Sequence, residues 1–370
     1  MKNILITGGA GFIGSHLCDE LIGKGYSVKV LDSLIAQVHG SNATRPEYLN
    51  PEVELIVGDV RDKATVLQAL KGVDAVYHFA ARVGVGQSMY EVNEYTDVNN
   101  RGTAVLLEAL IESPVKRLVV ASSMSIYGEG LYVLENGKVV EDASRPLAQL
   151  KNSQWELISE GLPLTPIPTP ETKKPSLASV YALSKYDQEV MSLICGKAYN
   201  IPTVALRFFN VYGTRQALSN PYTGVLAIFA SRYLNNKAPI IFEDGEQKRD
   251  FVHVKDVAKA CRLALEVEDA AYEVFNIGSG NSYTVTEIAQ KLSSTMGLQH
   301  IQPIATGEYR VGDIRHCFGD ISKAKRILGF EPEVDIKDGL QELALWLEEQ
   351  VAVDNVEQAK EELAARGLTV

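Results

Sequence analysis

The chain has 370 residues, of which 46% are hydrophobic and 22% are charged, and its formal net charge is −11 at pH 7. This length predicts two domains, or one large domain with an attached lobe. The acidic balance excludes a typical nucleic-acid binder, because a phosphate backbone is bound by a basic face. A small anionic ligand remains possible, since a few local cations are enough to hold it.

The cysteines and the N-terminus both predict a reduced, cytoplasmic protein. Cys18, Cys195, Cys261 and Cys317 are far apart, form no C-x-x-C pair and have no histidine at ligand spacing. This pattern favours free buried thiols over disulfides or a bound metal. The first apolar run, Ile4–Ile6, ends in glycines and predicts a buried strand rather than a signal peptide. No segment approaches the ~20 apolar residues of a membrane span, so we expect no membrane partner.

Strand-like and helix-like segments alternate along the chain. Strands are predicted at 2–7, 27–31, 53–57, 75–79, 116–121 and 203–208, and helices at 11–24, 63–70, 98–112, 180–199 and 225–235. Because these strands are apolar on both faces, we expect a parallel sheet covered by helices on both sides. The predicted fold class is therefore α/β, a doubly wound Rossmann sheet with a smaller C-terminal lobe.

The predicted organisation has three parts. Residues 1–209 form the Rossmann domain, 210–345 a smaller lobe that shares some sheet elements with it, and 346–370 a helical tail. An irregular insertion is predicted at about 129–178, and its proline-rich stretch at 162–170 should be extended. Such an insertion can be a lid, a binding loop or a passive surface excursion.

The C-terminal run from residue 340 to residue 366 has the periodicity of one amphipathic helix with many glutamates. We expect this helix to cap the molecule or to lie in solvent rather than to bind a partner.

A glycine-rich turn follows the first strand. Residues 7–14 read TGGAGFIG and contain G-x-G-x-x-G from Gly9 and G-x-x-G-x-x-G from Gly8. Such a turn lets a pyrophosphate approach the backbone at a helix N-terminus. Asp32 ends the next strand, 18 residues after Gly14, where a carboxylate accepts hydrogen bonds from a ribose diol and repels a 2′-phosphate. The sequence therefore predicts NAD rather than NADP.

Two further strand ends fit the same dinucleotide. Asp59 and Val60 follow the third strand and could contact adenine, and small residues follow the fourth strand, where a cofactor would lie close to the backbone. The residues predicted from this pattern to contact NAD are Gly8, Gly11, Phe12, Ile13, Gly14, Asp32, Asp59, Val60, Phe79, Ala80 and Ala81.

Tyr181 and Lys185 lie four residues apart on a predicted helix, so their side chains share one face. A neighbouring cation lowers the pKa of a phenol, normally near 10, and makes it a usable base. With 16 tyrosines in the chain, such a pair is expected about once by chance, so its meaning depends on context. Ser122 and Ser123 end the strand at 116–121, on the edge of the sheet where ligands bind.

These motifs, in this order, resemble the extended short-chain dehydrogenases/reductases, the family of nucleotide-sugar epimerases and dehydratases. The matching segments run from Thr7 to about Phe330 and also include Asn99, 207–213, 249–253 and Arg310. The resemblance implies that Tyr181 is the general base and acid and that Lys185 binds the nicotinamide ribose and keeps the phenolate ionised. Asn99, Tyr181 and Lys185 complete the implied NAD contacts.

The same resemblance implies a nucleotide-diphospho-sugar substrate. Ser123 would bind the reacting hydroxyl, assisted by Ser125, while Arg249 and Arg310 would clamp the diphosphate. The implied substrate-binding residues are Ser123, Ser125, Asn210, Val225, Arg249 and Arg310. We expect His253 to be structural rather than catalytic and the protein to be a homodimer that pairs through the helices at 98–112 and 180–199.

One departure from the family pattern separates the possible reactions. Dehydratases of this family carry Asp-Glu after the position of Ser123, whereas this chain has Met124 and Ser125, which cannot act as that acid and base. The expected reaction is therefore 4-epimerisation through a 4-keto sugar that is reduced again on its other face.

The substrate is less well defined by the sequence. The stretches 83–90 and 122–130, together with the insertion, resemble the dTDP-L-rhamnose 4-epimerase subgroup. The alternatives are a UDP-hexose or UDP-uronate 4-epimerase, an NAD(P)H-dependent 4-keto-sugar reductase and, outside the enzymes, an NAD-sensing scaffold.

Overall fold

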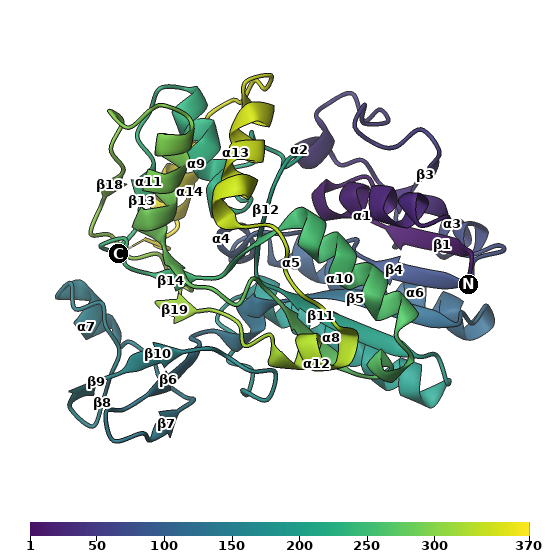
Figure 1. Cartoon of the computed structure of the whole chain (residues 1–370), viewed down its shortest axis with the longest axis horizontal. Coiled ribbons are helices and arrows are strands. Elements are labelled where there is room, and N and C mark those ends of the chain that lie inside the picture. Colours follow the sequence, from purple (N-terminus) through teal and green to yellow (C-terminus); the bar gives the residue numbers. More distant parts are fainter. Residues whose placement is uncertain (370) are drawn as a thin grey trace.

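A seven-stranded parallel sheet forms the centre of the molecule (Figure 1). The computed structural model describes residues 1–369. The strand order is β16-β11-β5-β4-β1-β2-β3, and every neighbouring pair is parallel. The strands are β1 (Asn3–Thr7), β2 (Ser27–Asp32), β3 (Glu54–Val57), β4 (Ala75–His78), β5 (Arg117–Ser123), β11 (Thr203–Phe208) and β16 (Val274–Ile277). The predicted doubly wound α/β fold is confirmed.

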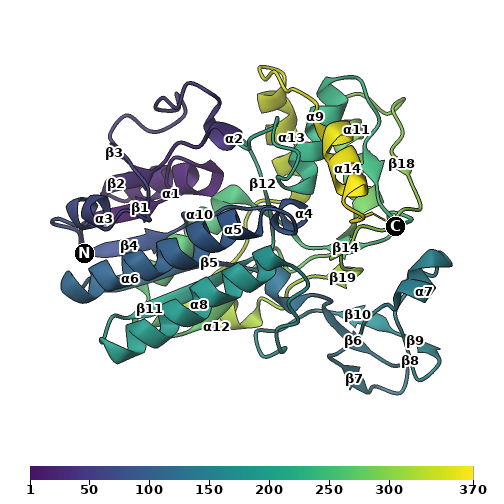
Figure 2. The same ribbon diagram turned by 180° about the vertical axis from the view of Figure 1, so that it is seen from behind.

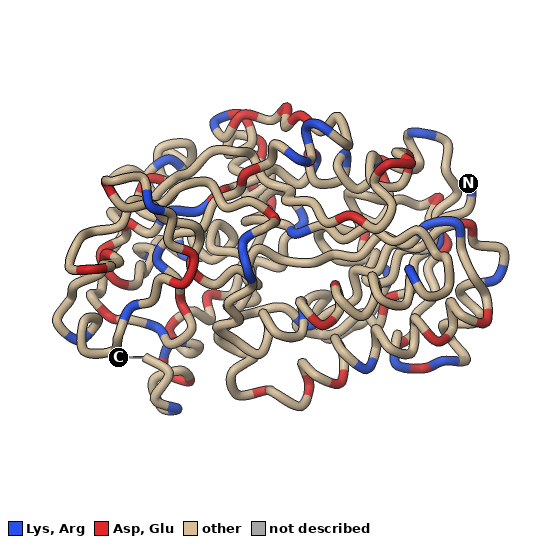
Figure 3. The backbone as a smooth tube through the Cα atoms, turned by 90° about the horizontal axis from the view of Figure 1, so that it is seen from below, with Lys and Arg blue, Asp and Glu red and all other residues tan. Residues whose placement is uncertain are grey.

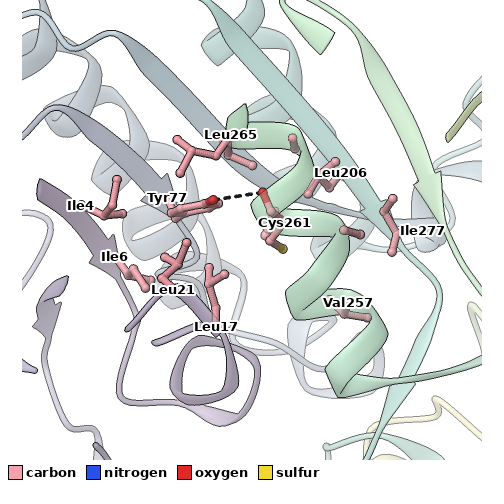
Figure 4. Packing of buried hydrophobic residues seen from close by; sticks show 14 of the residues in the cluster. Ile4, Ile6, Leu17, Leu21, Tyr77, Leu206, Val257, Cys261, Leu265 and Ile277 are labelled. Carbon is pink, nitrogen blue, oxygen red and sulfur yellow. Dashed lines mark hydrogen bonds between the residues drawn. The ribbon is translucent and has the colours of Figure 1, made fainter. Parts of the chain in front are cut away.

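Helices cover both faces of this sheet (Figures 1 and 2). One face packs against α1 (Phe12–Gly23), α10 (Val254–Glu266) and α12 (Ser322–Leu328). The other packs against α3 (Lys63–Ala69), α6 (Gly102–Glu112) and α8 (Val180–Ala198). Figure 4 shows Leu17 and Leu21 of α1 beside Cys261 of α10, where the buried Tyr77 hydroxyl donates a 3.0 Å hydrogen bond to the Cys261 carbonyl. These contacts bury the central strands on both faces, as their apolar sequences predict, whereas the edge strand β3 is partly exposed.

The strand order reverses between β1 and β4. The chain winds outward from β1 to β3, then crosses back to β4 and winds outward in the other direction. In open α/β sheets, ligands bind outside the carboxyl ends of the strands at this switch point. The fold therefore places the site at the ends of β1, β4 and β5.

The helix predicted at 98–112 begins earlier and is irregular. It consists of α5 (Val92–Tyr95), a π-helical turn at Thr96–Arg101 and α6. Shorter helical elements near the site are α2 (Ala36–His39), α4 (Val85–Ser88) and a 3-10 turn at Met124–Tyr127.

The smaller lobe packs around a second apolar core. Its helices are α9 (Val225–Leu234), α11 (Val285–Thr295) and α13 (Ile336–Leu347), and their buried faces meet at Phe229, Leu292 and Leu343. Its short strands are β12 (Asn210–Tyr212), β13 (Ile240–Ile241), β14 (Lys248–Arg249), β15 (Phe251–His253), β17 (Tyr283–Thr284), β18 (Ile304–Ala305) and β19 (His316–Cys317). Between them the chain returns to the first sheet as α10, β16 and α12.

The insertion is more regular than expected. Three short strands form an antiparallel sheet, a hairpin and a short helix flank it, and Tyr132, Leu157 and Leu164 form its core (Figure 1). The elements are β6 (Leu131–Val133), β7 (Val139–Val140), α7 (Leu147–Lys151), β8 (Ile158–Ser159), β9 (Leu162–Pro163) and β10 (Thr165–Ile167). The expectation of an irregular segment missed these elements, because strands of two or three residues are too short to show an alternating pattern. The proline-rich stretch is extended, as predicted.

A buried charge cluster joins the insertion to the smaller lobe. Arg315, 1% exposed, contacts Glu156 of the insertion at 2.5 Å and Glu243 of the lobe at 3.0 Å. Arg145 of the insertion also reaches Glu243, at 2.8 Å, and the Glu129 carboxylate accepts the backbone N–H of Arg315. The insertion is therefore attached to the lobe by charge-assisted hydrogen bonds rather than by an apolar core.

The prediction of a single C-terminal helix over 340–366 is wrong, because residues 348–355 are not helical and divide it into two helices. Helix α13 ends at Leu347, and α14 (Val356–Ala365) begins after eight intervening residues. Between them Ala352 is buried against the lobe and Asp354 binds Arg232 at 3.0 Å. The two helices pack against different surroundings.

Figure 3 shows Lys and Arg interspersed with Asp and Glu along the backbone. Among residues 1–369, no helix is long and apolar enough to cross a membrane, and no three His, Cys, Asp or Glu side chains are grouped to hold a metal ion. The four cysteines are free, and Cys195 is the partly exposed one.

Candidate active site

A cavity of about 890 Å³ lies at the carboxyl ends of the central strands, between the sheet and the smaller lobe. Its volume is at the upper end of the range for ligand pockets, ~300–1,000 Å³. Every residue predicted to bind NAD or substrate lines it except Asn99. The structure thus gathers residues from positions 8 to 310 around one space.

The glycine loop is shaped for a dinucleotide. Gly8 has a φ of +71°, and a Cβ there would lie 2.7 Å from the backbone nitrogen of Ala80. Helix α1 begins without a side-chain cap, so the N–H groups of its first turn are available to an anion at the wall of the cavity. At Gly11, by contrast, an added Cβ would lie 3.4 Å from its nearest neighbour, so the protein itself leaves room for a side chain at that position.

Asp32 is fixed at the end of β2. Its carboxylate accepts backbone N–H bonds from Ala10 at 3.0 Å and Leu34 at 2.9 Å, and it lines the cavity with one edge. This arrangement presents a carboxylate to a ribose diol beside the glycine loop. The uncapped helix, the close loop and this carboxylate together fit NAD, which supplies a reversible hydride acceptor when bound.

Asn99 was expected to contact NAD but does not line the cavity. It is fully buried in the π-helical turn. Its amide accepts the backbone N–H of Arg82 at 2.7 Å and donates to the Ser184 hydroxyl at 2.9 Å. Asn99 thus holds the loop after β4, which itself lines the cavity, and any effect on NAD is indirect.

Ser123 and Tyr181 meet at the centre of the cavity. Ser123 ends β5, and its hydroxyl oxygen accepts a 2.9 Å bond from the Ser125 hydroxyl. Tyr181 lies in the first turn of α8, which Ser179 caps, and its backbone N–H donates to the Ser88 hydroxyl at 3.0 Å. Burial raises the pKa of Tyr181, and its hydrogen bond with Ser123 offsets that effect in part.

Lys185 lies one helical turn after Tyr181 and is buried. Its ammonium donates a 2.8 Å hydrogen bond to the Gln188 side chain, and burial lowers its pKa to about 7, against the opposing effect of Glu189. The sequence predicts that Lys185 lowers the pKa of Tyr181. Within the chain alone the pKa of Tyr181 is instead raised, so the phenolate needs the positive charge of bound nicotinamide as well.

A buried polar network behind Lys185 escaped the sequence analysis. The Gln188 amide donates to the Thr103 hydroxyl at 2.9 Å and lies 3.2 Å from His78 Nε2, while His78 Nδ1 lies 2.8 Å from the Thr7 hydroxyl. Burial lowers the pKa of His78 to about 3, so the ring is neutral. The network gives Lys185 a neutral partner at a fixed distance. The one available signal was a glutamine three residues after the lysine.

The two arginines line the cavity with some of their donors already bound. Arg249 donates to the backbone carbonyls of Ile314 at 2.6 Å and Arg315 at 2.8 Å. Arg310 binds Asp313 through two bonds of 3.0 and 2.7 Å and lies over the Phe242 ring. A diphosphate held here must use the remaining N–H groups or displace Asp313.

The remaining predicted substrate residues differ in position from His253, which was expected to be structural. Asn210 and Val225 line the cavity, and Asn210 Oδ1 is a buried acceptor without a hydrogen-bond partner among residues 1–369. His253 does not line the cavity; its Nδ1 accepts the backbone N–H of Lys255, and its ring packs edge-on against Tyr212. These contacts agree with a structural histidine.

Comparison with known proteins, like the site, indicates an NAD-dependent enzyme that acts on nucleotide-sugars. The model of the NAD dependent epimerase/dehydratase family matches residues 4–153 and 158–278. A dTDP-L-rhamnose 4-epimerase from Burkholderia thailandensis is 34% identical over 354 residues, which cover 95% of this chain and 96% of that protein. A putative UDP-glucose 4-epimerase from Methanocaldococcus jannaschii is 34% identical over 93% of this chain and 98% of its own length.

Solved structures agree. The UDP-glucose 4-epimerase of Thermotoga maritima, crystallised with UDP-glucose, superposes with a TM-score of 0.77 at 33% identity and covers 94% of this chain and 98% of its own. That of Thermus thermophilus, in complex with NAD, gives a TM-score of 0.75 at 29% identity, with 94% and 100% coverage.

The fold and the site define an NAD-dependent enzyme of the extended short-chain dehydrogenase/reductase type. The chain belongs to the NAD-dependent epimerase/dehydratase family, within its nucleotide-sugar 4-epimerases.

Proposed function

We propose that this protein interconverts the C4 epimers of a nucleotide-diphospho-6-deoxy-sugar, with dTDP-L-rhamnose as the preferred substrate. The observation that carries the proposal is the Ser123–Tyr181–Lys185 arrangement next to Met124 and Ser125. This set can remove and return one proton at one hydroxyl, but it has no acid and base for eliminating water. The similarity to the Burkholderia enzyme, over almost the whole of both chains, supports the choice of sugar.

The residues of the chain have separate tasks. Ser123 binds the C4 hydroxyl and passes its proton to Tyr181, the general base. Lys185 holds the cofactor ribose and keeps the phenolate charged. Arg249 and Arg310 hold the diphosphate while the 4-keto sugar turns over in the cavity, and Tyr181 then returns the proton. Because the hydride taken from C4 is given back, the reaction consumes no cofactor.

The test is incubation of the purified protein with dTDP-L-rhamnose, UDP-glucose, UDP-galactose and UDP-glucuronate, without added cofactor, followed by chromatography. We expect the C4 epimer of dTDP-L-rhamnose to form fastest. Faster conversion of a UDP-sugar would refute the preferred substrate but not the epimerase. A requirement for stoichiometric NADH would contradict epimerisation and indicate a reductase.

We further propose that the protein is a cytoplasmic homodimer whose subunits pair through α6 and α8. Two apolar residues on one side of α8, Leu183 and Ile194, are 46% and 62% exposed. They are eleven residues apart, close to three helical turns, so they form one continuous apolar side. Four free thiols support a reducing compartment.

A further inference from the structure

The C-terminal helix α14 contributes one of its faces to the cavity. Val356, Ala359, Lys360 and Leu363 line it. Their spacing of i, i+3, i+4 and i+7 places all four on one side of a helix. The cavity is therefore closed on this side by a segment that follows both lobes in the sequence.

This face lies beside the catalytic end of the cavity. Leu363 packs against Gly86 of α4, where an added Cβ would lie 3.4 Å from the leucine side chain. Ser88 of the same short helix accepts the backbone N–H of Tyr181. Leu363 and Tyr181, the proposed general base, thus both contact α4.

Contacts with both lobes hold α14 in place. The Glu362 carboxylate accepts hydrogen bonds from Tyr90, at 3.2 Å, and Tyr222, at 3.1 Å. The Arg366 guanidinium lies 4.2 Å from the centre of the Tyr90 ring. Tyr90 follows α4 beside the sheet, whereas Tyr222 precedes α9 of the smaller lobe. The helix thus bridges the lobes over the cavity.

The two ends of this face differ in chemistry. Lys360 is paired at 2.9 Å with Glu308, two residues before Arg310, and so belongs to the diphosphate side. Toward α4 the wall consists of Leu363, Ala359 and Val85, none of which has a side-chain donor or acceptor. Burying a methyl group against such an apolar wall is favourable in free energy. A hydroxyl or carboxylate buried there loses its hydrogen bonds to water and finds no partner in the wall.

We infer that α14 is the wall that selects the C6 substituent of the sugar and that Leu363 is its main specificity-determining residue. C6 is two bonds from C4, and this wall lines the same cavity as Ser123 and Tyr181, so we place C6 of a sugar whose C4 hydroxyl lies at those residues against it. The apolar surface favours a 6-deoxy sugar over its 6-hydroxy or 6-carboxy counterpart. The inference rests on the proposed function and specifies the substrate class of the same site.

The test compares two probes that differ only at C6, dTDP-L-rhamnose and dTDP-L-mannose. The preference for the first, as the ratio of kcat/KM values and as the ratio of dissociation constants from calorimetry, is measured for wild type, Leu363→Asn and Ala359→Ser. We expect both variants to lower the preference, Leu363→Asn by about tenfold, the effect of a small change in an apolar pocket. Ala359→Ser adds a hydroxyl at little cost in packing and keeps the test valid if Leu363→Asn fails to fold.

The control is Glu361→Ala, an exposed position on the far side of the same helix, which should leave both ratios unchanged. Unchanged ratios in a folded Leu363→Asn and in Ala359→Ser would overturn the inference. If wild type converts neither sugar but the two variants shift the ratio of dissociation constants as expected, the proposed reaction is refuted and the inference about α14 is supported.

Discussion

Tyr181 is the residue on which the proposed chemistry depends most directly. Replacing it with phenylalanine removes the hydroxyl that bonds to Ser123 and keeps the ring that packs edge-on against Tyr95. We expect Tyr181→Phe to fold and bind NAD normally, while kcat falls by about 10²–10⁴, the usual contribution of a general base. Tyr26→Phe, which removes a surface bond to Glu266, is the matched control. Turnover near that of wild type would show that another group removes the proton.

Lys185 should make stability depend on pH. Burial lowers its pKa in the folded protein to about 7, whereas an unfolded lysine has a pKa near 10.4. Between these values the unfolded chain binds more protons, so the free energy of unfolding rises with pH from about 7 to about 10. The slope attributable to Lys185 is at most about 1.4 kcal/mol per pH unit.

The measurement is urea unfolding of wild type and Lys185→Met at pH 6 to 9, without added nucleotide. The unfolding free energy of wild type minus that of Lys185→Met should become more positive as the pH rises. A difference that stays constant over this range would mean that the buried lysine keeps its proton.

Among single residues, those that line the cavity could be predicted better than those that lie behind them. Tyr181, Lys185 and Ser123 could be predicted because spacing and strand ends bring them to one edge of the sheet. Gln188 and His78 come from different elements, and nothing in either local stretch indicates that they meet. The same holds for Asn99, which supports a loop instead of lining the cavity.

Among the elements, the insertion depends on charged contacts more than on its small core. Arg315→Ala would leave Glu156 and Asp244 without their guanidinium partner. These two carboxylates are 51% and 37% exposed, and the buried Glu243 keeps Arg145, so we expect a loss of unfolding free energy of about 1.5–3 kcal/mol, the contribution of hydrogen bonds to a charged group.

Urea unfolding of Arg315→Ala tests this expectation. Lys138→Ala is the control, because its ion pair with Glu160 is exposed on both sides and should contribute less than about 1 kcal/mol. If the two variants lose the same free energy of unfolding, the buried cluster does not stabilise the insertion.

The elements that could be predicted are those with strong periodicity. The bounds of β1, α8 and β11 agree with the sequence within a residue or two, since each is long, apolar or capped. The small sheet of the insertion has strands of only two or three residues. The break between α13 and α14 arises from a contact with Arg232, far away in the sequence, that no local pattern reveals.

For the whole molecule, the proposed pairing of subunits can be tested at one position. Ile194 is 62% exposed on α8, and a glutamate there would place a charge in the centre of the proposed interface. We expect Ile194→Glu to be monomeric in light scattering at concentrations where wild type is a dimer. Leu345→Glu, at a residue 60% exposed on α13, should leave the dimer intact. A wild-type protein that is monomeric at micromolar concentration would refute the proposed dimer.

The distribution of the thiols has a practical consequence for such work. Burial raises the pKa of Cys18 and Cys317 to about 12 and also raises that of Cys261, so these three thiols are protonated and shielded from reagents. Cys195 is partly exposed and is next to Ile194. The native protein thus offers a single labelling position without any engineered cysteine. A maleimide dye attached there would report, by self-quenching or energy transfer, when two subunits approach each other.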